Sequence, residues 1–290
     1  MHESSDIPQI IWRTRTREFD LTRRGVVMGI LNVTPDSFSD GGRFVDIESA
    51  LDHADAMIAH GAEIIDVGGE STRPGAEPVD EREELRRVLA IIEQLAKRPG
   101  HGARFVISID TMKPAVARAA LRAGASIIND VGGFRENEMV GAAKESGAGV
   151  IIMHMQGDPK TMQDSPLYAD VCGEVREFFC ASLLRCVASG VPAAAIAFDP
   201  GIGFGKSSAH NLALLRRTNE LAPPGHALAV GVSRKSFIGK VTGFPAVEDR
   251  EWPTVALTCH AREHGARIFR VHDVKPNVEA LRMTEAILGA

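Results

Sequence analysis

The chain has 290 residues, of which 44% are hydrophobic and 24% charged. This balance is typical of a globular protein, and the length allows two small domains or one large α/β barrel. The formal net charge of -5 argues against a nucleic-acid partner, and no apolar run approaches the ~20 residues that a membrane span needs, so no membrane partner is expected.

Residues 1–25 precede the first predicted barrel strand and form an N-terminal extension. Within it, residues 10–21 can pair as a short β-hairpin that plugs the bottom of the barrel. Arg13, Arg15 and Arg17 alternate as on one solvated strand face, and we assign them no binding role. The remaining residues, 26–290, are predicted to form a single domain.

Eight short apolar runs follow, and nearly every run leads into a polar residue. Such continuous, β-branched runs are typical of strands buried on both faces. They cover residues 26–31, 63–67, 105–109, 126–128, 150–153, 195–198, 227–232 and 268–271. Amphipathic segments separate them and predict helices at 47–60, 80–97, 114–123, 138–146, 171–189, 210–220, 254–264 and 277–288.

This alternation of strand and helix predicts the α/β class and a (β/α)₈ TIM barrel. A doubly wound open sheet shares the alternation, but it would concentrate polar strand ends at one switch point. Because polar residues end nearly all the strands here, the barrel is favoured, and its site is expected where the carboxyl ends of the strands meet.

Three polar residues at strand ends form the strongest candidate group. Asp110, Asn129 and Asp199 come from different strands and would converge at the barrel mouth. Carboxylates there suit a flat heterocycle with an amidine-like edge, because one carboxylate can accept two parallel N–H bonds. Asp130 and Asp273 also follow strands, and for them we expect no more than helix capping.

A second group carries positive charge from the last two strands, where barrels commonly hold phosphate groups. Its members are Arg234, Lys235, Arg270 and His272. Together, the two groups predict a ligand made of a heterocycle and a phosphate. The cationic residues also allow an anionic substrate despite the negative net charge.

Three further patterns are weaker. Residues 199–207 look like a phosphate loop, but the Walker register would need glycine at Pro200 and the dinucleotide register would need glycine at Lys206. A flexible loop beside the site is the remaining interpretation, and residues 34–42 read as a mobile lid. The H-x-x-E-H pattern at 260–264 lies on a predicted outer helix without a third ligand, so solvated histidines are expected.

The four cysteines show no C-x-x-C spacing, and the N-terminus has no basic start followed by an apolar core. Free thiols in a reducing compartment are therefore expected, with no signal peptide and a cytoplasmic location.

Longer motifs resemble the dihydropteroate synthase family. LNVTPDSFSDGG at 31–42 and GGESTRPG at 68–75 are similar to its two signature loops. MHMQG at 153–157, DPGIGFGK at 199–206, SRKS at 233–236 and RVH at 270–272 match the same family. The resemblance runs in unbroken order over about residues 10–288.

The resemblance implies a transferase of folate biosynthesis and a sulfonamide target. It would join 6-hydroxymethyl-7,8-dihydropterin pyrophosphate to p-aminobenzoate, giving 7,8-dihydropteroate and pyrophosphate. Asp110, Asn129, Asp199 and Lys235 would hold the pterin, and Arg270, His272 and Asn32 the pyrophosphate, with Mg²⁺ at Asn32. The remaining substrate-binding residues would be Phe38, Asp40, Thr72, Arg73, Pro74, Met153, Phe204 and Ser236, with Asp40 ordering the first loop.

The same resemblance assigns catalytic roles to Asp110, Arg73, Lys235, Arg270 and His272. An arylamine is already unprotonated at neutral pH, so departure of pyrophosphate is the demanding step. Mg²⁺ and the cationic residues would stabilise the leaving group, and Asp110 the pterin cation, which predicts an SN1-like substitution. The two loops would exclude water until the amine arrives.

The family also implies a homodimer formed through outer helices. The segment at 251–254 opens the predicted penultimate helix where small residues are expected, so its Trp252 is expected to alter either the local packing or the dimer contact. Two other functions share the pterin cluster: a methyltransferase with a corrinoid partner, and a pterin-binding protein without activity. The first would not require the loop at 37–40 or the SRKS motif, and the second would be expected to lose residues such as Asn32, Arg73, Arg270 and His272.

Overall fold

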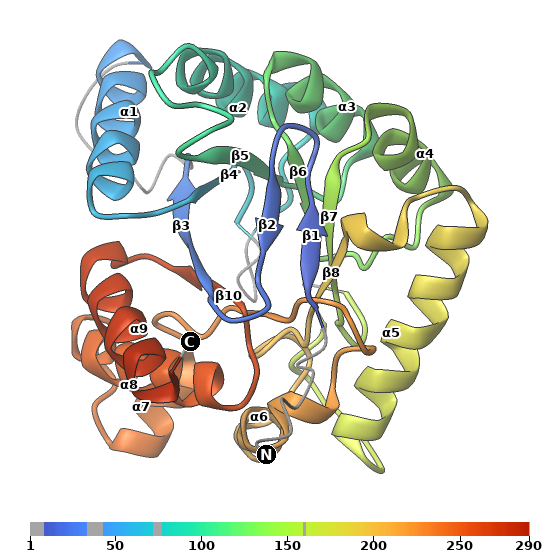
Figure 1. The fold of residues 1–290 in the computed structure, drawn as a ribbon, viewed down its shortest axis with the longest axis vertical. Helices are drawn as coiled ribbons and strands as arrows, with labels where there is room; N and C mark the ends of the chain where they lie inside the picture. Colours follow the sequence, from blue (N-terminus) through green and yellow to red (C-terminus); the bar gives the residue numbers. More distant parts are fainter. Residues whose placement is uncertain (1–8, 34–42, 72–76, 159–160, 290) are drawn as a thin grey trace, which may run out of the picture.

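The protein is a parallel β-barrel surrounded by helices, and a computed structural model describes residues 9–33, 43–71, 77–158 and 161–289. The barrel strands are β3 (Val26–Asn32), β4 (Ile64–Gly68), β5 (Val106–Asp110), β6 (Ile127–Asp130), β7 (Gly149–Met153), β8 (Ile196–Asp199), β9 (Ala229–Val230) and β10 (Ile268–Val271). They follow the order β8-β7-β6-β5-β4-β3-β10-β9, and a parallel bridge between Phe198 and Leu228 closes the ring (Figure 1). The predicted TIM barrel is thus confirmed.

Helices cover the outside of the barrel. They are α1 (Arg43–Ala59), α2 (Glu81–Ala96), α3 (Pro114–Ala123), α4 (Asn137–Ser146), α5 (Val171–Ala188), α6 (Ser208–Arg216), α7 (Ser236–Thr242), α8 (Glu251–Glu263) and α9 (Val274–Leu288). Their ends follow local chemistry: Asp80 accepts from the Glu83 N–H at the start of α2, and Pro114 opens α3. None of the described helices is long and apolar enough to cross a membrane.

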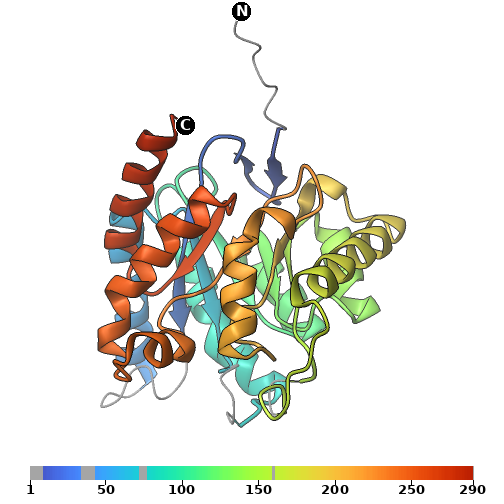
Figure 2. The same ribbon diagram turned by 90° about the horizontal axis from the view of Figure 1, so that it is seen from below.

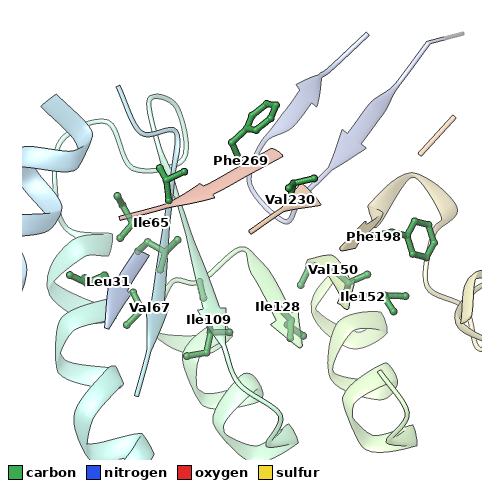
Figure 3. Close-up of a cluster of buried hydrophobic side chains, with 14 of the residues drawn as sticks. Leu31, Ile65, Val67, Ile109, Ile128, Val150, Ile152, Phe198, Val230 and Phe269 are labelled. Atoms are coloured by element: carbon green, nitrogen blue, oxygen red, sulfur yellow. The ribbon is translucent and has the colours of Figure 1, made fainter. Parts of the chain in front are cut away.

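The strands are apolar on both faces because each face packs on a different layer. The outward side chains, such as Leu31, Ile65 and Val67, lie between the sheet and the helices (Figure 3). This cluster includes the apolar stripe of α2, from Val88 to Leu95. Continuous apolar runs therefore follow from burial on both faces, as the sequence indicated.

The predicted hairpin is confirmed, and it closes one end of the barrel (Figure 2). Trp12 on β1 (Ile11–Arg13) pairs with Phe19 on β2 (Glu18–Asp20), and both side chains are buried. The Trp12 indole also donates to the Ala195 carbonyl at 3.0 Å. The hairpin packs on inward-facing residues near the amino ends of the strands, namely Val26, Met28, Ile64, Val106, Ile127, Ile151, Ala197, Ala227, Ala229 and Ile268.

The elements differ from the prediction in three places. The seventh barrel strand is only Ala229–Val230, because the chain leaves the ladder before Gly231. Helix α7 was not expected, since seven residues are too few to show a helical period. Helices α1, α8 and α9 begin at Arg43, Glu251 and Val274, three or four residues before the predicted bounds.

Candidate active site

The barrel interior changes from apolar to polar toward the carboxyl ends of the strands. On five strands, a polar or charged side chain follows two residues after the apolar layer that touches the hairpin. These residues are Asp66 on β4, Ser108 on β5, Asn129 on β6, Asp199 on β8 and Arg270 on β10. Asp110 ends β5 and is paired in register with Asn129. The three residues of the first candidate group thus converge at one mouth, as expected.

Arg270 joins two carboxylates inside this mouth. Its Nε lies 2.6 Å from Asp66 Oδ2, and its Nη2 lies 2.7 Å from Asp110 Oδ2. Asn129 donates from Nδ2 to the same Asp66 oxygen at 3.1 Å. Because these carboxylates are buried, the ion pairs compensate for much of the cost of removing them from water.

Burial sets the acidity of the two strand-end aspartates. It raises the pKa of Asp110 to about 7, with Arg270 opposing the rise and the charge of Asp66 adding to it. Burial also raises the pKa of Asp199, against the hydrogen bond from the Gly201 N–H at 2.7 Å and the charge of Lys235. Both groups are therefore acceptors whose ionisation is sensitive to what fills the mouth.

An open cavity lies above this network. Its polar lining includes Asp110, Asn129, Asp199, Lys235 and Arg270. Its apolar lining is Val131, Met153, Ile202 and Phe204. Polar groups on one side and a polarisable apolar wall on the other suit a flat aromatic heterocycle that must be oriented by hydrogen bonds.

Lys235 connects two of the loops that line the cavity. It precedes α7, and its Nζ lies 4.0 Å from the centroid of the Phe204 ring. This cation–π contact joins the loop after β9 to the loop after β8. Ser236 is the exposed first residue of α7, so it lies beside Lys235 at the mouth.

The Ser233 hydroxyl positions His272 through two contacts. Ser233 Oγ lies 2.9 Å from the His272 Nδ1 and accepts from the His272 N–H at 3.1 Å. These contacts fix the ring at the end of β10, two residues after Arg270. Asn32 ends β3 and is paired in register with Gly68, which is paired in turn with Asp110. The expected anion-binding residues thus share the mouth with the acceptors.

Two expectations for charged residues were wrong. Arg234 does not add its charge to the mouth, because Asp273 binds its guanidinium through two oxygens at 2.6 and 3.0 Å. Asp273 stands at the N-cap position of α9, yet its side chain makes this ion pair and no capping bond. Asp130 accepts from the Gly132 and Phe134 N–H groups, so it stabilises a loop and not the start of a helix.

The pattern at 260–264 lies on α8 in the outer layer, away from the mouth. His260 Nε2 contacts the Leu215 carbonyl at 3.2 Å, and His264 Nδ1 contacts the His260 carbonyl at 2.8 Å. Both rings are half-buried, so the histidines expected to be solvated are only partly exposed. Contacts with backbone carbonyls explain the placement of both histidines, so no catalytic role is needed.

Sequence reasoning missed two buried groups near the mouth. Asp66 interrupts the apolar run at 63–67, and a charge inside such a run was the signal that could have revealed it. Lys206 is also buried, and burial lowers its pKa to about 7. Its Nζ lies 3.0 Å from His154 Nδ1 and donates to the Phe204 carbonyl at 2.9 Å, which anchors the loop that carries Phe204.

The remaining predicted site residues lie outside the described ranges. These are Phe38, Asp40, Thr72, Arg73 and Pro74.

Comparison with known proteins points to one family. The family described as pterin binding enzyme matches residues 28–272. Dihydropteroate synthase of Escherichia coli is 48% identical over 91% of this chain and 92% of its own length. Dihydropteroate synthase of Yersinia pestis, solved with a sulfonamide drug, has a TM-score of 0.89 and 46% identity over 97% of this chain and 100% of that chain.

The chain belongs to the dihydropteroate synthases. A third relative, the dihydropteroate synthase of Burkholderia cenocepacia, was solved with 7,8-dihydropteroate. It has a TM-score of 0.87 and 42% identity, covering 97% of this chain and 98% of that chain. The resemblance of the sequence motifs to this family is thus confirmed, and so is the assignment of the protein as a transferase.

Proposed function

We propose that the protein condenses 6-hydroxymethyl-7,8-dihydropterin pyrophosphate with p-aminobenzoate to give 7,8-dihydropteroate and pyrophosphate. The observation that carries the proposal is the convergence of Asp110, Asn129, Asp199, Lys235 and Arg270 around one cavity with an apolar wall. Membership of the dihydropteroate synthases supports the same reaction.

The pterin lies in the cavity at the barrel mouth. Its amino and ring N–H groups donate to Asp110 and Asp199, and Asn129 completes the polar side. Met153 and Phe204 contact the face of the ring. Lys235, above Phe204, supplies positive charge near the carbonyl edge of the heterocycle.

The pyrophosphate lies toward β3 and β10, where Arg270 and His272 face its oxygens. Asn32 offers one neutral oxygen at the same mouth. Such a sparse donor set fits a Mg²⁺ ion that takes its other ligands from pyrophosphate and water. When bound, the ion would neutralise charge that develops on the leaving group.

The p-aminobenzoate lies at the outer side of the cavity. Phe204 and Ser236 are its described neighbours, and we assign Phe38, Thr72, Arg73 and Pro74 to the same side, with Asp40 ordering its loop. Because the Yersinia pestis relative was solved with a sulfonamide drug, we propose that sulfonamides compete here for the p-aminobenzoate site.

The substitution is SN1-like. Loss of pyrophosphate leaves a positive charge on the exocyclic carbon of the pterin, which Asp110 stabilises as a buried anion, and the neutral amine of p-aminobenzoate then attacks. Positional exchange of oxygen within unreacted pyrophosphate substrate is expected, and a strictly concerted isotope-effect pattern would contradict this mechanism.

We further propose a cytoplasmic homodimer. Large apolar side chains are exposed around α7 and α8, including Phe244 and Trp252, which are 62% and 73% exposed. Exposed apolar surface of this kind favours association with a second copy. Because its side chain is large, Trp252 exposes more apolar surface on this face than a small residue would.

A pyrophosphate-release assay tests the proposed function. The dihydropterin pyrophosphate is supplied with and without p-aminobenzoate, and release that depends on the arylamine is expected. Pterin binding without release would favour a non-enzymatic pterin-binding protein. Methyl transfer from methyltetrahydrofolate to a corrinoid, without pyrophosphate release, would favour the methyltransferase.

A further inference from the structure

Asp66 is a fully buried carboxylate in the layer beneath the cavity. It does not belong to the cavity lining, yet its two contacts, Asn129 and Arg270, both do. We propose that Asp66 is a positioning residue that determines which polar atoms Asn129 and Arg270 present to the pterin. This inference rests on the proposed function, because it assigns a role toward the same ligand.

The orientation of the Asn129 amide follows from the chemistry of Asp66. An ionised carboxylate can only accept hydrogen bonds, so Asn129 must turn its NH₂ group toward Asp66, and Nδ2 lies 3.1 Å from Oδ2. The Oδ1 atom of Asn129 is then the amide atom left for a ligand. Asp110, Asp199 and Asn129 thereby offer three acceptors, which suits the N–H-rich edge of a pterin.

Asp66 also holds one end of the Arg270 guanidinium. The Nε atom binds Asp66 Oδ2 at 2.6 Å, while Nη2 binds Asp110 at 2.7 Å. Since the two carboxylates come from neighbouring strands β4 and β5, the guanidinium is fixed across them. Arg270 therefore meets the substrate in one orientation and does not need to be ordered on binding.

Stability alone does not explain a charge at this position. Oδ2 makes both hydrogen bonds of Asp66, whereas Oδ1 is buried without a partner among the described residues. Ser108 is paired in register with Asp66, and its buried Oγ also has no partner there. Replacing buried ionic groups by well-packed apolar ones is often neutral or stabilising, so a carboxylate retained here points to function.

The Asp66→Ala variant tests the inference because it removes the one oxygen that Asn129 and Arg270 share. Without that oxygen, nothing at position 66 holds the Asn129 amide with its Oδ1 toward the cavity, and the Arg270 guanidinium loses one of the two carboxylates that fix it. Calorimetry with 6-hydroxymethyl-7,8-dihydropterin is expected to show a Kd roughly 10- to 100-fold higher. The KM for the pterin substrate should rise similarly, while the KM for p-aminobenzoate stays unchanged.

Two further variants separate positioning from a general disturbance of the interior. Ser108→Ala removes a buried polar group from the same layer without touching Asn129 or Arg270, so pterin affinity within twofold of wild type is expected. Asp66→Asn keeps the acceptor, because its amide oxygen can take the place of Oδ2 and its NH₂ group the place of the unpartnered Oδ1. Its pterin affinity should therefore stay close to that of wild type.

Three results would overturn the inference: unchanged affinity in Asp66→Ala, an equal loss in Ser108→Ala, or an equal loss in Asp66→Asn. Failure of the wild-type protein to bind the pterin would instead refute the proposed function, and the inference with it. The wild-type measurement therefore distinguishes the two failures.

Discussion

The two ends of the barrel are built by the same strands with opposite chemistry. Strand β4 turns Ile64 toward the hairpin and Asp66 toward the mouth, and β10 does the same with Ile268 and Arg270. The hairpin end buries apolar surface and stabilises the fold, whereas the mouth buries charge that stabilises it little. Two residues along a strand thus separate a stabilising position from a functional one, as is general for TIM barrels.

Removing the centre of the hairpin end is expected to give the largest change in stability. Trp12→Ala leaves a cavity against the barrel floor and an unbonded Ala195 carbonyl, so the free energy of unfolding should fall by about 3–5 kcal/mol. Denaturant unfolding measures the loss, and the KM values should remain those of wild type. A raised KM for the pterin in the folded variant would show that the two ends are coupled.

Removing one acceptor at the mouth should lower pterin affinity and leave stability nearly unchanged, which is the reverse of the result expected for Trp12→Ala. Asp199→Asn places a donor where the pterin needs an acceptor, and we expect affinity for the dihydropterin to fall roughly 100-fold, or about 2.7 kcal/mol. Thermal unfolding should change little, because the variant no longer has to remove a buried carboxylate from water when it folds. Unchanged affinity by calorimetry would remove Asp199 from the pterin site.

Lowering the pH should weaken pterin binding at the mouth and leave the hairpin end unchanged. The pKa of Asp110 is raised to about 7, so this acceptor is ionised above that pH and protonated below it. Pterin affinity is therefore expected to fall about tenfold between pH 8 and pH 6. Asp110→Asn should bind weakly with no such pH dependence, whereas a flat profile in the wild type would mean that Arg270 keeps Asp110 ionised throughout.

The smallest effect is expected on the solvent face of the hairpin. Arg13 pairs with Glu18 at 3.2 Å, but both side chains are more than half exposed. Arg13→Ala should therefore lower the free energy of unfolding by no more than about 0.5 kcal/mol and leave turnover unchanged. A larger loss would show that the hairpin depends on surface charge as well as on Trp12.

The barrel and most of the mouth could be predicted because their signals are local in the sequence. Apolar runs ending in Asp110 or Asp199 identify both a strand and its polar end. The charge of Asp66 inside an apolar run is visible in the sequence, but its contact with Arg270 is not, since the two residues lie on strands far apart along the chain. The pairing of Arg234 with Asp273 joins two loops 39 residues apart and leaves no local pattern.

The hairpin also has a consequence for how the chain is completed during synthesis. Trp12 is made 183 residues before Ala195, the residue whose carbonyl its indole binds. A nascent chain shorter than this separation cannot finish the floor of the barrel, so the hairpin must wait for the second half to emerge. Burial of Trp12 therefore coincides with closure of the barrel. A change in Trp12 fluorescence would report this late stage of folding.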